Sequence, residues 1–108
     1  MGFEKELKLL QSTEDSLKEK GTKELYEKLY QRFMGFYRKS GISKEDAKDL
    51  ISTSFLKIYL KAYQVKDPKK FEAWCWTIAR NNMMDLFEKN KKYKNNVSEE
   101  VLNDDEII

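Results

Sequence analysis

Residues 43–62 read SKEDAKDLISTSFLKIYLKA, and this stretch combines a helix start with one continuous apolar face. Ser43 can cap a helix by accepting from a free backbone amide, and the carboxylate of Asp46 is favoured by the positive end of the helix dipole. Apolar and small residues then recur three and four apart, as one buried helical face requires. They are Ala47, Leu50, Ile51, Ser54, Ile58 and Ala62. We predict a helix from Ser43 to about Tyr63.

The residues before this stretch show the same spacing and predict two more helices. One runs from about Phe3 to Lys20 and ends at Gly21, a natural left-handed stop. The other runs from about Lys23 to Ser40 and is closed by Gly41. Their expected inward side chains are Phe3, Leu7, Leu10 and Leu17 in the first helix and Leu25, Leu29, Phe33 and Phe36 in the second.

A fourth helix is predicted after a short loop through Val65 and Lys66. Asp67-Pro68 supplies a cap followed by proline at the first helical position, and the helix should run to about Lys92. It carries two apolar stripes, which are Phe71, Trp74, Cys75, Ile78 and Leu86 on one side and Trp76, Arg80, Met83, Met84 and Phe87 on another. Either this helix is buried all round, or Trp76 and Arg80 face a base-stacking or partner surface.

The length of 108 residues suits one domain with its own core. The single proline and the few glycines leave long helical stretches uninterrupted. We therefore expect an all-α fold, a compact bundle of about four helices, over residues 1–94. Residues 95–108 are polar and acidic and are predicted to form a linker or a frayed tail.

Composition narrows the function. Lys and Arg number 21 against 19 Asp and Glu, a net charge of +2, so any nucleic-acid binding must depend on local charge. With one cysteine and no histidine, an intrachain disulfide and a cysteine or histidine metal cluster are excluded, and we expect no metal and no cofactor. The sequence contains neither a glycine-rich phosphate loop nor a nucleophile motif, so we do not expect an enzyme. Without a signal peptide or a bilayer-length apolar run, we expect a cytoplasmic protein with no membrane insertion.

Three pieces of the sequence together carry a family resemblance. They are Leu25-Tyr26, then Asp46-Ala47-Lys48-Asp49-Leu50-Ile51 with Phe55, then Phe71-Glu72-Ala73-Trp74 with Ile78-Ala79-Arg80-Asn81 and Asp85. In this order and spacing they resemble region 2 of the extracytoplasmic-function sigma factors, the smallest members of the main bacterial sigma family. The resemblance runs from Leu25 to about Lys94. It implies a helical domain that binds core RNA polymerase and recognises and melts the promoter minus-ten element during transcription initiation.

The resemblance also implies a polymerase contact. By position, Asp46, Asp49, Ser52 and Thr53 would dock on the coiled coil of the polymerase beta-prime subunit. The family usually has glutamine and then glutamate where this chain has Ser52 and Thr53, so both side chains are shorter and one charge is missing. For Asp46 and Asp49, helix capping and solubility are the alternative roles.

A second implied surface would hold single-stranded promoter DNA. By position, Val65, Ile78 and Asn81 form a pocket for a base flipped out of the nontemplate strand, with Trp76 and Arg80 beside it. An apolar wall suits the face of a base, and an amide can read its polar edge. Lys91 and Lys92 belong to a basic strip that could follow the phosphate backbone. Core packing is the alternative role for Ile78.

Family members normally continue into a helix-turn-helix domain after a flexible linker. This chain is therefore either a fragment that ends in that linker, which we expect, or a stand-alone remnant. An alternative function remains open. The chain could be a helical interaction module of the same fold that binds only protein, as a decoy for the polymerase or for an anti-sigma factor. Ser52, Thr53 and the modest net charge favour this alternative.

Overall fold

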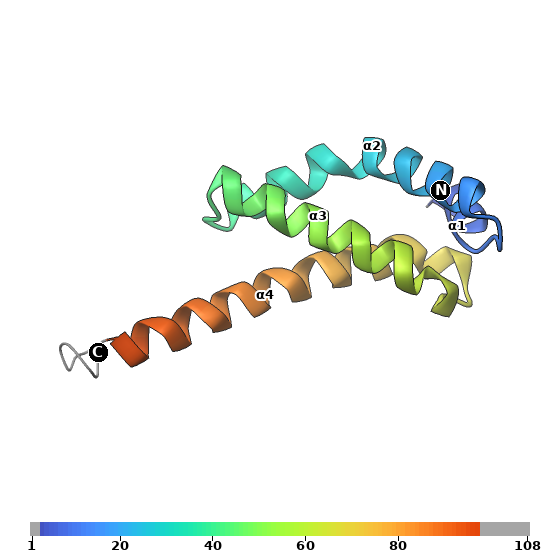
Figure 1. Ribbon diagram of the computed structural model, residues 1–108. Helices are drawn as coiled ribbons and strands as arrows, with labels where there is room; N and C mark the ends of the chain where they lie inside the picture. The colour runs from blue at the N-terminus through green and yellow to red at the C-terminus, as the bar shows by residue number, and fades with distance from the viewer. Residues whose placement is uncertain (1–2, 98–108) are drawn as a thin grey trace.

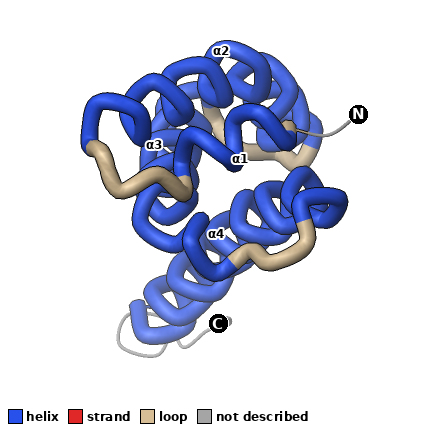
Figure 2. Tube along the Cα trace, turned by 90° about the vertical axis from the view of Figure 1, so that its right-hand side faces the viewer, coloured by secondary structure: helices blue, strands red, loops and turns tan. Residues whose placement is uncertain are grey.

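The computed structural model describes residues 3–97 and the side chains of residues 3–91. Within this part every regular element is helical, which confirms the all-α expectation (Figure 1). The elements are α1 (Glu4–Leu10), α2 (Asp15–Lys39), α3 (Lys44–Lys61), two short 3-10 turns (Ala62–Gln64 and Pro68–Lys70) and α4 (Phe71–Val97). Figure 2, seen from the end where α1 lies, shows α2, α3 and α4 around a common centre. The C-terminal half of α4 runs past the other helices (Figure 1).

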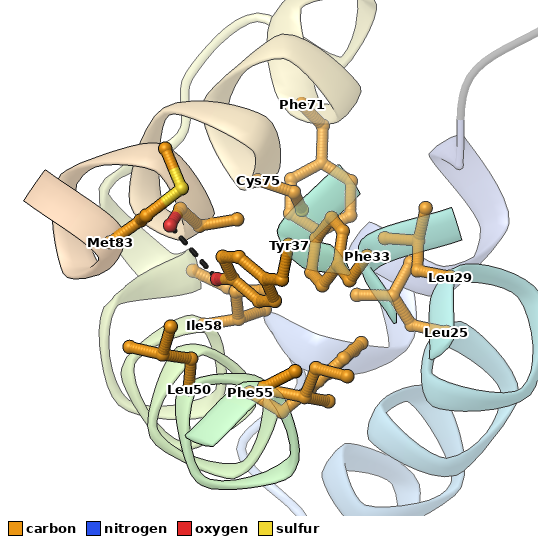
Figure 3. Packing of buried hydrophobic residues seen from close by; sticks show 14 of the residues in the cluster. Leu25, Leu29, Phe33, Tyr37, Leu50, Phe55, Ile58, Phe71, Cys75 and Met83 are labelled. Carbon is orange, nitrogen blue, oxygen red and sulfur yellow. Dashed lines mark hydrogen bonds between the residues drawn. The ribbon is translucent and has the colours of Figure 1, made fainter. Parts of the chain in front are cut away.

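The core forms where one side of each long helix meets the other two (Figure 3). Its rows are Leu25, Leu29, Phe33 and Tyr37 from α2, Ala47, Leu50, Ile51, Phe55 and Ile58 from α3, and Phe71, Cys75, Ala79 and Met83 from α4. All six residues expected to face inward between Ala47 and Ala62 are buried, and Phe55 is buried as well. Burial raises the pKa of the Cys75 thiol, so this cysteine is an inert core residue.

The expected start and stop signals hold at three places. Ser43 Oγ accepts from the backbone N–H of Asp46 at 3.1 Å, and Asp67 Oδ1 accepts from that of Lys69 at 3.0 Å. The Asp67 cap begins the second 3-10 turn, which leads directly into α4. Gly41 closes α2 with a φ of +91°, a left-handed backbone that glycine adopts without strain.

The expected first helix is wrong in two respects. The chain breaks after Leu10, not at Gly21, because Gly21 lies inside α2 at its closest approach to α1. A Cβ at Gly21 would lie 2.8 Å from the Cβ of Leu9 and 3.0 Å from the backbone oxygen of Glu6. Glycine is therefore needed there for contact between two helices. Leu17, expected inward, is 36% exposed, because α1 ends before it can cover the first turn of α2.

Polar contacts hold α1 in place. The carboxylate of Glu6 is buried against α2 and pairs with Lys28, and this hydrogen bond raises the pKa of Lys28. Gln11 Nε2 donates to the backbone oxygens of Ala62 at 3.0 Å and Val65 at 2.8 Å. These bonds join the end of α1 to the connection between α3 and α4.

The last helix is longer than expected, since α4 reaches Val97 and not only Lys92. Most of the predicted tail, residues 98–108, lies outside the described residues, so its role as a linker stays a prediction. No helix in the described part has the length and apolar character needed to span a bilayer.

Candidate functional site

The outward face of α3 carries all four residues expected at a protein contact. Asp46, Asp49, Ser52 and Thr53 are exposed, whereas the neighbouring Ala47, Leu50, Ile51 and Ser54 point into the core. None of the four outward side chains packs in the core. This surface is therefore open to a partner along more than one turn of helix.

The same face continues into an apolar strip that the sequence reasoning missed. Leu56 and Leu60 are 58% and 57% exposed, and Tyr63 in the following 3-10 turn is 70% exposed. They lie seven, eleven and fourteen residues after Asp49, a spacing that places them on the same side of the helix as Asp49. Large apolar side chains out of phase with the core row were the signal in the sequence. We call the surface made by Asp46, Asp49, Ser52, Thr53, Leu56 and Leu60 the α3 face.

Ile78 and Asn81 meet at a hollow between α3 and α4. The hollow has a volume of about 140 Å³ and is lined by Lys57, Lys61, Ile78, Asn81 and Asn82; we call it the Asn81 hollow. Ile78 is half-buried and Asn81 is exposed, so an apolar wall and a free amide lie side by side. Of the three residues expected to form a pocket, the structure thus brings two together.

Val65, the third, is not among the residues that line the Asn81 hollow. It lies in the connection between the two 3-10 turns, half-buried against the core, and its carbonyl accepts the bond from Gln11. The antiparallel packing of α3 on α4 places this connection at the start of α4, about ten residues before Asn81.

Trp76 and Arg80 line a different hollow, of about 270 Å³, with Phe36, Ala73 and Thr77. The Trp76 ring stands edge-on to Phe33, with centroids 4.7 Å apart, and to Phe36 at 5.6 Å. On this side the guanidinium of Arg32 lies 5.7 Å from the Trp76 ring centroid and pairs with Glu72 at 3.0 Å. Trp76 is half-buried between α2 and α4, and much of its surface is used in packing.

The second stripe of α4 is therefore mixed, and neither of the two alternatives for this helix holds along its whole length. Met83 is 7% exposed and belongs to the core. The next residue, Met84, and Phe87 one turn further on are 53% and 40% exposed, because α4 there begins to leave the other helices. The first half of α4 packs one side against the other helices, whereas large apolar side chains are exposed in its second half.

A chain of buried polar groups joins α2, α3 and α4. The Tyr37 hydroxyl donates to the backbone oxygen of Ala79 at 2.9 Å, which is the dashed line in Figure 3. The same hydroxyl lies 3.2 Å from Ser54 Oγ. Asn82 Nδ2 donates to Ser54 Oγ at 2.8 Å, and Lys57 Nζ donates to Asn82 Oδ1 at 2.6 Å. Burial raises the pKa of Tyr37, while the hydrogen bond to Ser54 acts in the opposite direction. The chain begins in the core and ends at the Asn81 hollow.

Asn82 and Lys57 were also missed in the sequence. Asparagine is disfavoured inside helices, so two asparagines in succession indicate a specific role for each. The sequence analysis assigned a role only to Asn81. Asn82 follows Cys75 and Ala79 by seven and three residues, a spacing that places it on the core side of α4.

Positive charge gathers around the connection between α3 and α4. Lys61, Lys66, Lys69 and Lys70 are exposed there, and Lys57 is half-buried beside them. Lys91 is exposed far along α4, whereas the side chain of Lys92 lies outside the described residues. The basic residues nearest to the Asn81 hollow are thus not those of the expected C-terminal strip. No cluster of three or more acidic or thiol side chains that could hold a metal ion occurs among residues 3–91.

Comparison with known families places these surfaces in one matched region. The family model described as Sigma-70 region 2 matches residues 25–93. The matched residues include most of α2, all of α3, both 3-10 turns and most of α4. No curated protein and no solved structure matches the chain significantly.

Proposed function

The chain belongs to the sigma-70 region 2 family, and from that membership we propose that it binds core RNA polymerase and captures single-stranded promoter DNA at the minus-ten element. In this proposal the α3 face contacts the coiled coil of the beta-prime subunit, and the Asn81 hollow receives a base flipped from the nontemplate strand. The activity is binding and strand opening, with no catalytic step by the domain itself. Such a domain works beside the polymerase in the bacterial cytoplasm.

The observation that carries the proposal is the placement of the α3 residues. All four positions assigned to the polymerase contact lie on one outward face and leave the core to their neighbours. Leu56 and Leu60 add apolar area to this face, which suits a protein partner better than water. Asp46 and Asp49 can supply charge complementarity, which guides association.

The DNA part of the proposal is supported by the chemistry of the Asn81 hollow. Ile78 offers an apolar surface to a base and Asn81 offers both a donor and an acceptor. Lys57 and Lys61 add positive charge where a phosphate backbone would pass. Unstacking a base costs a few kcal/mol, and contacts of this kind have to offset it.

We assign the chain to the extracytoplasmic-function subclass because of its motif pieces. The run Phe71-Glu72-Ala73-Trp74 with Ile78, Arg80 and Asn81 supports this finer assignment. An anti-sigma factor would be a further protein partner, since the α3 face is the surface that such a regulator has to cover to block polymerase.

A second candidate function is a protein-only interaction module of the same fold. The exposed Leu56 and Leu60 and the short side chains of Ser52 and Thr53 favour it, because they would suit a protein decoy equally well. In that case Asn81 and Ile78 would have no role toward DNA.

Binding in two steps separates these functions. The purified chain is mixed with bacterial core polymerase and passed over a sizing column, and the complex is then titrated with labelled single-stranded and duplex DNA. The proposed function predicts co-elution and tighter binding of the single strand. Co-elution without a preference for single strands would support the protein-only module. A folded chain that does not co-elute with polymerase contradicts both.

A further inference from the structure

The buried polar chain ends at Lys57, which lines the Asn81 hollow and donates to Asn82. Asn82 is 5% exposed and both ends of its amide are used, since Nδ2 donates to Ser54 Oγ and Oδ1 accepts from Lys57 Nζ. Ser54 is fully buried and is held in turn within reach of Tyr37. The orientation of the Asn82 amide therefore follows from its partners in the core.

This arrangement restricts the ammonium group of Lys57. A surface lysine normally samples many rotamers on its four-carbon stem. Here a hydrogen bond of 2.6 Å to a buried oxygen fixes its end beside Asn81, with Ile78 as the apolar neighbour. An ammonium group has three donors and no acceptor, so after the bond to Asn82 two donors remain for a molecule in the hollow.

We propose that Asn82 is a positioning residue that holds Lys57 in the Asn81 hollow, and that Lys57 makes this hollow select a base with an acceptor edge, guanine over adenine. The inference rests on the proposed capture of a single-stranded base. Guanine presents O6 and N7 as adjacent acceptors, a pair that lysine reads well. Adenine presents an N6 amino donor at the same place, and two donors facing each other cannot form a hydrogen bond.

The contribution of Asn82 differs from ordinary stabilisation. A buried amide with all its bonds made contributes to packing wherever it lies. The oxygen of Asn82, however, faces Lys57 at the surface and not a core group. A substitution that removes this oxygen should therefore abolish the base preference, whereas one that keeps an oxygen at that place should preserve it.

The test uses three variants and one control on the full chain. Lys57→Met removes the ammonium and keeps the stem, Asn82→Leu removes the acceptor that holds it, and Asn82→Asp keeps an acceptor oxygen at that place. Lys66→Met removes an exposed lysine that does not line the hollow. The probes are oligodeoxyadenylate strands whose central nucleotide is adenine, guanine or inosine. Inosine keeps O6 and N7 and lacks the N2 amino group.

The wild-type chain and Lys66→Met should bind the guanine and inosine strands roughly tenfold more tightly than the adenine strand, the scale of one good base contact. Lys57→Met and Asn82→Leu should lose this preference, and Asn82→Asp should keep it. Thermal unfolding of each variant shows whether it is folded. If Asn82→Leu does not fold, the Lys57→Met variant decides the result.

Two results would overturn the inference and can be told apart. If the wild type binds single strands but Lys57→Met weakens all three equally, Lys57 is a phosphate contact and the proposed function still stands. If the wild-type chain prefers no single strand over duplex DNA, the proposed base capture fails, and the inference fails with it.

Discussion

Tyr37 contacts all three long helices through its phenol group. Its hydroxyl bonds to Ala79 of α4 and lies beside Ser54 of α3, and the residue itself belongs to α2. The hydroxyl is fully enclosed, so its deprotonation would leave a charge in an apolar setting. The raised pKa of Tyr37 expresses this cost.

Stability should consequently depend on alkaline pH through Tyr37. Its pKa is higher in the folded state, so its contribution is complete below the unfolded pKa of about 10 and is lost as pH rises through the folded pKa. We expect Tyr37→Phe to be about 1 kcal/mol less stable at neutral pH and to lose less stability than the wild type at alkaline pH. Urea unfolding at both pH values measures this. Lys28 also has a raised pKa, but it contributes to both proteins alike and cancels in the comparison.

Substitutions of Asn81 and of Lys91 should have different effects on DNA binding, because Asn81 is proposed to recognise a base and Lys91 to contact the phosphate backbone. Asn81 is exposed and lies outside the buried polar chain, so Asn81→Ala should leave stability nearly unchanged. Its affinity for a matched minus-ten strand should fall by about 1–3 kcal/mol. Lys91→Ala should instead weaken all strands alike and lower the salt dependence by about one unit of slope. Titrations of matched and scrambled strands at several salt concentrations test both. An Asn81→Ala protein that is unfolded, or equally weak on both strands, would remove Asn81 from the site.

For single residues, the sequence indicated which chemical groups a site could offer better than it indicated where each side chain points. The resemblance placed Asn81 and Ile78 together, and both line one hollow, as positions three apart on a helix can. The roles of Asn82 and Tyr37 depend on partners in other helices, and no spacing within one segment could have revealed them. Val65, assigned by the same resemblance, does not line that hollow.

Among the elements, α1 is the one whose course the sequence did not predict. A break without proline or glycine at residues 11–14 is hard to detect, and Gly21 offered a more obvious stop. The helix α3 was predicted well because its cap and its apolar row agree, as at Ser43 and in the face from Ala47 to Ala62. Agreement of several local signals is what made this segment predictable. By contrast, α2 begins at Asp15, eight residues before the expected start at Lys23.

The two glycines of α2 should respond in opposite ways to alanine. At Gly21 the new Cβ would meet Leu9 and the backbone of Glu6, so Gly21→Ala should push α1 away and destabilise the protein by roughly 1–3 kcal/mol. At Gly35 no atom lies within 4 Å, so Gly35→Ala should gain helix propensity and stabilise by about 0.5–1 kcal/mol. Chemical denaturation of both variants checks this. A stabilised Gly21→Ala protein would contradict the close packing of α1 on α2.

Over the whole molecule, the proposed function is divided between two surfaces. The α3 face looks outward from the bundle, and the Asn81 hollow lies where α3 packs on α4. Because α3 contributes to both surfaces, this one helix would fix the position of a bound DNA strand relative to a protein bound on the α3 face. Five lysines, at positions 57, 61, 66, 69 and 70, lie toward the end of α3 and in the connection to α4, whereas Asp46 and Asp49 lie in the first half of α3.

The contact with polymerase is the central claim, and the affinity of the chain for the beta-prime coiled coil tests it most directly. The measurement is a titration of the labelled chain with that coiled coil, for the wild type, for Asp49→Lys and for the control Glu27→Lys, an exposed acidic residue on α2. Circular dichroism establishes that all three are equally helical. We expect saturable binding by the wild type and the control, and binding at least about tenfold weaker by Asp49→Lys. Equal binding by Asp49→Lys, or no binding by a folded wild type, would contradict the account.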